Sequence, residues 1–248
     1  MRCLRDLPRV WKMVILIVLS LPTNLLRFSN IWLHNALSEL WPTVPAGEVA
    51  YLVFIATNLL AGISLLIVLL AVEWIEKPIS IRKFFKLGPL DWPGLGLIAV
   101  LTFALNTLER LFLRRLVFEP VRLFLLSRGL WGGPSLEVGF QPPHHYIPLN
   151  LVLLILVLWV EAPEEIFFRG YVQNHLQEIK GPNIAVFLGA AIWSGWHIFA
   201  PAEFLRIFVY GLSLGFVFRL RQNSTPLAIW HPVSNRLLMF AYLVRASA

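Results

Sequence analysis

Apolar stretches recur along this chain of 248 residues, and several approach the roughly 20 residues that a helix needs to cross a hydrocarbon core. Backbone groups in lipid must find hydrogen-bond partners within the protein, so each stretch has to be a helix or part of a closed barrel. The stretches are runs of leucine, isoleucine and valine without two-residue alternation. That pattern favours helices over strands. We therefore expect an all-α membrane protein.

Composition supports the same class. Hydrophobic residues make up 58% of the chain and charged residues only 14%, with a mean hydropathy of +0.71. A soluble globule of this length needs more polar surface than these residues supply. The sequence thus predicts a multi-pass integral membrane protein with one domain, residues 1–248.

Seven helices, or eight with one doubtful segment, are expected to form a transmembrane bundle. The doubtful segment is Leu111–Trp131, where arginines interrupt an apolar pattern at helical spacing. We interpret it as an amphipathic helix on the membrane surface. The first span resembles a signal peptide, but no small-residue cleavage site follows it, and we interpret it as an anchor. The expected spans are Val10–Leu26, Val49–Trp74, Trp92–Leu108, Ile147–Phe168, Asn183–Phe199, Phe204–Leu220 and Thr225–Val244.

The net charge of +7 reflects topology better than nucleic-acid binding, because the basic residues lie in short loops beside spans. Lysines and arginines flank the cytoplasmic ends of membrane helices. Those between Arg2 and Lys12 predict a cytoplasmic N-terminus. The arginines of residues 110–128 conflict with this topology, because they would fall outside the cell. We expect membrane lipids as partners and no nucleic acid.

A single cysteine, Cys3, excludes an intramolecular disulfide and a thiolate metal site. His144 and His145 lie in a connection rich in glycine and proline, and we interpret them as a solvated pair in an exposed loop.

The chemistry begins with Glu164, Glu165 and Arg169, three ionisable residues within a turn and a half of an apolar helix. One charged side chain at a membrane centre costs roughly 2.5 to 3.5 kcal/mol. Glu165 and Arg169 are four residues apart and can pair on one helical face, whereas Glu164 points about 100° away from Glu165. Glu164 is therefore the natural general base, since a desolvated carboxylate accepts a proton from water more readily. A solvated helix cap with an ion pair is the alternative for this motif alone.

Two histidines in later apolar stretches favour the catalytic interpretation. His197 ends one stretch and His231 begins another. A lone membrane histidine is usually a polar residue that faces a neighbouring helix. Asn235 follows His231 by four residues, so both side chains share a helical face. An asparagine amide can donate to a developing oxyanion.

Together these residues form an ordered series: EExxxR at Glu164 to Arg169, an aromatic residue four before His197, and HxxxN at His231 to Asn235. In this order the series resembles the CPBP family of intramembrane proteases, which includes CAAX prenyl endopeptidases and bacteriocin-processing or Abi proteins. The resemblance covers about residues 159–240, which would form the catalytic core. Trp193 stands where phenylalanine is common in the family, a departure that keeps an aromatic wall.

The resemblance implies a role for each residue. Glu164 would activate water and His197 would help to hold it. His231 and Asn235 would stabilise the oxyanion of a tetrahedral intermediate. Glu165 and Arg169 would support and orient the site.

Metal dependence is a separate question. Glu164, His197 and His231 would be the ligands of a three-residue zinc site with an open position for water. The chain lacks HExxH, and these ligands come from three separate helices. We favour a glutamate protease without a cofactor and keep zinc as the alternative.

Two other functions are weighed. A transporter also places ionisable residues near the midplane, but it should show two related halves, and none is evident. A nonenzymatic immunity or scaffold protein should have lost at least one of the four catalytic candidates, Glu164, His197, His231 and Asn235, and none is lost. The predicted function is an endopeptidase for a membrane-associated or lipidated protein or peptide. The sequence does not choose among a prenylated protein, a bacteriocin or pheromone leader and a C-terminal sorting tail.

Overall fold

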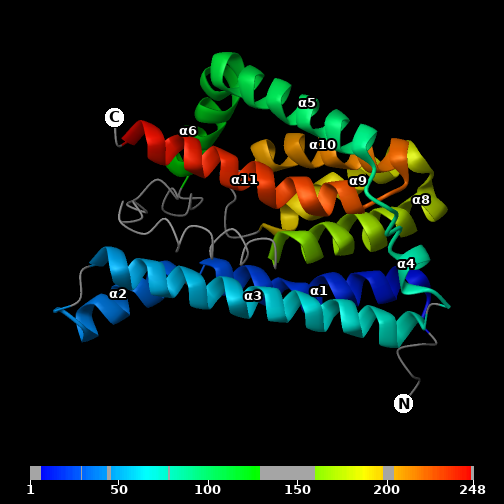
Figure 1. Ribbon diagram of the computed structural model, residues 1–248, viewed down its shortest axis with the longest axis horizontal. Coiled ribbons are helices and arrows are strands. Elements are labelled where there is room, and N and C mark those ends of the chain that lie inside the picture. Colours follow the sequence, from blue (N-terminus) through cyan, green and yellow to red (C-terminus); the bar gives the residue numbers. More distant parts are fainter. Residues whose placement is uncertain are drawn as a thin grey trace.

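The computed structural model describes residues 7–28, 30–43, 46–77, 79–128, 160–197 and 204–246 (Figure 1). Every regular element in these ranges is a helix, which confirms the predicted all-α class. Cys3, His144 and His145 lie outside the described residues, as does the connection rich in glycine and proline.

Where the structure describes the predicted spans, they lie mainly in helices, whereas residues 147–159 and 198–199 of two spans lie outside the described residues. The expected span Trp92–Leu108 has the same bounds as α5. The helix that we expected to end at Phe168 instead continues through a π-helical segment to Lys180. The helices are α1 (Arg9–Phe28), α2 (Asn30–Leu40), α3 (Ala46–Glu76), α4 (Ile81–Phe84), α5 (Trp92–Leu108), η2 (Glu109–Phe118), α6 (Glu119–Ser127), η3 (Ile166–Gln173), α8 (Asn174–Lys180), α9 (Pro182–Trp196), α10 (Phe204–Arg221) and α11 (Thr225–Ala246).

Among the residues that the structure describes, one helical segment, Ala56–Glu76 within α3, is long and apolar enough to cross a membrane by length and composition. A second span is counted if Trp92–Leu108 and Leu111–Val121, which meet at a bend of 60°, form one broken helix. The larger number of seven or eight spans stays a prediction from the sequence.

The helices share an apolar core. Helices α1 and α3 form one layer, which lies along the group of η3, α8, α9, α10 and α11 in Figure 1. Leu16 and Leu65 from the first layer are fully buried in the same cluster as Phe167, Phe168 and Leu214. Between helices in a membrane, such side chains contribute by close packing rather than by removal from water. Helix η3 thereby lies at the centre of the protein, and its residues cannot reach water easily.

Polar contacts join the two layers at one end. Glu76, near the end of α3, accepts a hydrogen bond of 3.1 Å from the Tyr171 hydroxyl of η3. Its other oxygen lies 3.5 Å from the Lys12 ammonium of α1. The Glu76 carboxylate of α3 therefore contacts both α1 and η3.

A second junction fixes the start of α11. The Ser224 hydroxyl donates to the Phe85 carbonyl at 2.8 Å, and the Asn223 side chain accepts from the Gly88 backbone N–H at 3.0 Å. Gly170 lets this segment approach η3, because a Cβ there would collide with the Phe85 carbonyl. These contacts anchor α11 beside η3, so His231 in its second turn reaches the residues of the EExxxR motif.

Candidate active site

The EExxxR motif lies where the helix changes its winding. Residues 160–165 are α-helical, and the π-helical turn η3 begins at Ile166. Such π-helical turns occur frequently at functional sites, because they rotate the side chains on either side relative to each other. Glu164, Glu165 and Arg169 are fully buried, with relative exposures of 0%. Three ionisable groups this deep need partners close by.

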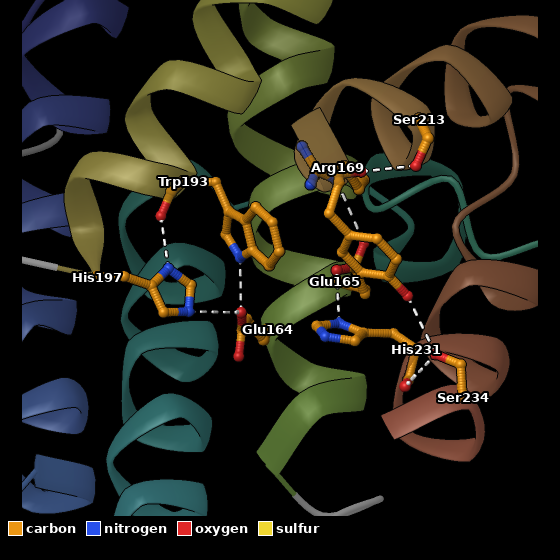
Figure 2. A network of polar contacts seen from close by, with 9 residues as sticks. Glu164, Glu165, Arg169, Trp193, His197, Ser213, His231 and Ser234 are labelled. Atoms are coloured by element: carbon orange, nitrogen blue, oxygen red, sulfur yellow. Dashed lines mark hydrogen bonds and ion pairs between the residues drawn. The ribbon is translucent and has the colours of Figure 1, made fainter. Parts of the chain in front are cut away.

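Glu165 has two of those partners (Figure 2). Its Oε2 lies 3.3 Å from Nε of Arg169, so the pair expected from the four-residue spacing is present. Its Oε1 lies 2.9 Å from Nδ1 of His231. An ionised carboxylate can only accept, so Nδ1 of His231 donates. Glu165 therefore links its own helix to α11.

Glu164 faces the other way, toward α9. The indole Nε1 of Trp193 donates to its Oε1 at 2.6 Å. The same oxygen lies 3.8 Å from Nε2 of His197. Glu164 and His197 belong to two different expected spans, and the structure brings their side chains together.

The tautomer of neutral His197 follows from its other nitrogen. Nδ1 lies 2.8 Å from the Trp193 carbonyl, which can only accept, so Nδ1 carries a proton. In the neutral ring Nε2 then has a lone pair that faces Glu164. A separation of 3.8 Å is too long for a direct hydrogen bond but suits one bridging water. His197 retains 14% side-chain exposure, whereas Glu164 retains none.

The His231 ring is enclosed by aromatic side chains. Its centroid lies 5.8 Å from the rings of both Trp193 and Tyr210. The Tyr210 hydroxyl lies 3.0 Å from Ser234 Oγ, and Ser234 donates to the His231 carbonyl at 2.9 Å. Tyr210 lies in an apolar stretch, and Ser234 occupies an unspecified position of the HxxxN motif, so the sequence did not point to either residue. Tyr210 packs against the His231 ring, whereas Ser234 contacts the His231 backbone carbonyl.

Arg169 lies over Trp193, with its guanidinium carbon 5.1 Å from the indole ring. A cation above an indole face is attracted to the ring quadrupole. Gly211 of α10 also approaches the indole closely, since a Cβ there would lie 2.9 Å from Trp193 Cε3. The indole that contacts Glu164 is thus held by a cation and by a close backbone approach.

Three further residues lie within about one helical turn of the site residues along the sequence. Asn235 follows His231 on α11 and is partly exposed. Glu161, one turn before Glu165, is buried with 3% exposure. Trp196 is also buried and packs edge-on against Phe168 at 5.0 Å, as expected for a core residue.

The alternative zinc set was Glu164, His197 and His231. His231 uses Nδ1 to contact Glu165, so Nε2 is the ring nitrogen that a metal would have to bind. Within the described ranges, no group of three histidine, cysteine, aspartate or glutamate side chains has the arrangement of a metal site.

A model of a known protein family matches part of the chain. Residues 147–237 match the family model described as type II CAAX prenyl endopeptidase Rce1-like. The matched segment includes every residue from Glu164 to Asn235, and it confirms the family resemblance expected from the three motifs. No curated protein sequence and no solved structure matches the chain.

Proposed function

We propose that this protein is an intramembrane endopeptidase in which Glu164 activates a water molecule for attack on a peptide bond. The observation that carries the proposal is the contact of Glu164 Oε1 with Trp193 at 2.6 Å and its 3.8 Å separation from Nε2 of His197. One water between Glu164 and His197 would have an acceptor on each side. The family match at residues 147–237 supports the same class of reaction.

The proposed reaction needs two steps. The water oxygen attacks the carbonyl carbon of the peptide while one of its protons passes to Glu164. The carbonyl oxygen becomes an oxyanion, and the tetrahedral intermediate then collapses with cleavage of the C–N bond. Glu164 returns its proton to the departing amine. A positioned base of this kind contributes roughly 10²- to 10⁴-fold in rate.

His231 and Asn235 are the proposed oxyanion donors. His231 protonated on both nitrogens donates through Nδ1 to Glu165 and through Nε2 to the oxyanion. Asn235 would add its amide N–H from the next turn of α11. Removing one such donor typically costs about 10²- to 10³-fold in rate. Glu165 and Arg169 act through His231 and are positioning residues.

The proposed substrate is a membrane-associated peptide, and a prenylated C-terminal peptide is the first choice because the matched family is described by that activity. The apolar surface of the helices suits a substrate that arrives within the bilayer. Leader peptides and C-terminal sorting tails are the other classes to test. The N-terminus is proposed to be cytoplasmic, on the basis of the basic residues that precede α1.

The test compares wild type with Glu164→Gln on a farnesylated peptide and on a panel of apolar peptides in detergent, with and without a chelator. Glu178→Gln is the matched control, because Glu178 is half exposed on α8 and pairs with Arg9 at the surface. We expect cleavage by wild type and by the control, no cleavage by Glu164→Gln, and no effect of the chelator. Loss of cleavage with the chelator would instead support zinc. A folded wild type that cleaves none of the peptides would favour the scaffold function.

A further inference from the structure

The segment from η2 through α6, residues 109–128, combines positive charge with exposed apolar side chains. It contains five arginines and two glutamates. Arg114 and Arg115 are exposed. Leu111, Leu116 and Leu123 on the same segment are also exposed, by 63%, 72% and 55%. In water, the exposure of these apolar side chains would be unfavourable.

The segment turns away from the rest of the bundle. Residues Leu111–Val121 run at 60° to α5, and in Figure 1 η2 and α6 descend from the far end of α5 across the bundle rather than along it. At the start of the segment, the Glu109 carboxylate lies 4.0 Å from the Arg206 guanidinium of α10. This ion pair joins the start of the segment to α10.

An open surface hollow of about 560 Å³ lies on this segment, lined by Arg114, Arg115, Glu119, Pro120 and Leu123. Two guanidinium groups line it together with one carboxylate, that of Glu119, and with the side chains of Pro120 and Leu123. Guanidinium groups bind phosphate oxygens well, because their N–H groups form a planar fork. Apolar walls next to such a fork suit the start of an acyl chain.

We propose that η2 and α6 lie in the membrane interface and that Arg114 and Arg115 bind the phosphate of an anionic phospholipid, with Leu111, Leu116 and Leu123 inserted among the acyl chains. Basic residues beside a membrane are attracted to anionic lipids, and an amphipathic segment adds buried apolar area. With α5 along the membrane normal, a bend of 60° would turn the segment toward the membrane plane. Lipid phosphates would also neutralise the arginines that conflict with the expected topology.

A broken transmembrane span is the competing arrangement for α5 and η2. That arrangement would place Arg114 and Arg115 within the hydrocarbon region. Each arginine there costs roughly 2.5 to 3.5 kcal/mol on insertion scales. The interfacial position avoids this cost, because both side chains reach the headgroup layer directly.

The test uses the full chain in detergent with equal amounts of phosphatidylcholine and phosphatidylglycerol, and native mass spectrometry measures which lipid stays bound. Arg114→Gln with Arg115→Gln removes the two charges, and Arg114→Lys with Arg115→Lys retains them as the matched control. We expect wild type and the lysine variant to retain phosphatidylglycerol selectively. The glutamine variant should retain it on the order of tenfold less. Added glycerol phosphate should leave the selectivity unchanged.

A second measurement tests the position of the segment independently of lipid choice. Cys3→Ser leaves no native cysteine, so a fluorescent probe can be attached at Leu116→Cys alone. In vesicles of both lipids, quenchers at the headgroup level should reduce its fluorescence more than quenchers at the bilayer centre. A probe at the bilayer centre, equal lipid retention by the glutamine variant, or displacement of the lipid by glycerol phosphate would each overturn the proposal.

Discussion

The indole Nε1 of Trp193 lies 2.6 Å from Oε1 of Glu164, the carboxylate of the proposed base. The hydrogen bond fixes one carboxylate oxygen, and the same oxygen faces His197. Trp193 also contacts Arg169 through its ring face. One side chain thus joins the proposed base to the guanidinium that supports Glu165.

We predict that Trp193→Phe lowers kcat by roughly ten- to a hundredfold, because it removes a hydrogen bond to a charged group, and such bonds contribute about 1.5 to 3 kcal/mol. The aromatic ring is retained, so the thermal midpoint in detergent should change little by comparison. Steady-state kinetics with a cleaved peptide give kcat and KM separately. Unchanged kcat would mean that the indole N–H does not position Glu164 for the reaction.

A glycine allows Trp193 to occupy its position. We predict that Gly211→Ala shifts the indole, because the added Cβ would lie 2.9 Å from its Cε3. Overpacking of this kind usually costs about 1 to 3 kcal/mol. Intrinsic tryptophan fluorescence and thermal unfolding should both change, and activity should fall.

Gly96→Ala is the matched control for that substitution. Gly96 lies on α5, where an added Cβ has no atom within 4 Å, so alanine should be neutral or slightly stabilising. Equal effects of the two alanines would show that the close approach at Gly211 does not matter.

The sequence predicted some contacts of the site and missed others for physical reasons. The pair of Glu165 and Arg169 follows from helical spacing alone, and it is present at 3.3 Å. The 3.8 Å approach of Glu164 to His197 did not follow, because linear spans carry no information on how far helices slide past each other. The motifs and the family resemblance were needed to expect that the two residues meet.

Trp193 and Tyr210 illustrate a second limit of the sequence. Trp193 was expected only to form an aromatic wall, and the sequence did not point to Tyr210, because the motifs carry no information on their polar atoms. Their N–H and O–H groups contact Glu164 and Ser234 in the structure. A buried tryptophan or tyrosine usually finds such a partner, so aromatic residues one turn from a candidate base are worth testing in any membrane site.

Glu165 should matter more for stability than Glu164. It contacts both Arg169 and His231, and all three side chains are buried. Removal of one member of a buried charge pair typically costs about 3 to 5 kcal/mol, because the other charge is left without compensation. We predict that Glu165→Ala lowers the thermal midpoint strongly.

Glu178→Ala provides the comparison for that prediction, because Glu178 also pairs with an arginine, Arg9, but the pair is exposed at the surface. Exposed ion pairs contribute little to stability, and salt screens them. Thermal unfolding in one detergent at one pH compares the two variants directly. Similar midpoints would show that Glu165 does not stabilise the site.

Asp91 provides a test at the membrane surface, where it precedes α5 and accepts two hydrogen bonds of 2.6 and 2.7 Å from Arg221. The hydrogen bond from Arg221 lowers the pKa of the Asp91 carboxyl below its usual value. A carboxyl with a lowered pKa in the folded state contributes stability above its unfolded pKa, and the contribution is lost as the pH falls through the folded value. We therefore predict a stabilising contact that is constant from neutral pH down to about pH 5 and disappears only in stronger acid.

Asp91→Asn isolates this contribution, because asparagine also caps a helix N-terminus and can keep the hydrogen bond to the Gly94 backbone N–H. Thermal midpoints of wild type and variant should differ by a small, constant amount between pH 5 and pH 8, and salt should reduce the difference because the pair is partly exposed. Below about pH 4 the two curves should converge as the wild-type carboxyl takes up its proton. A difference that grows as the pH falls would contradict the sign of the pKa shift, and it would place the acid sensitivity of the fold at another group.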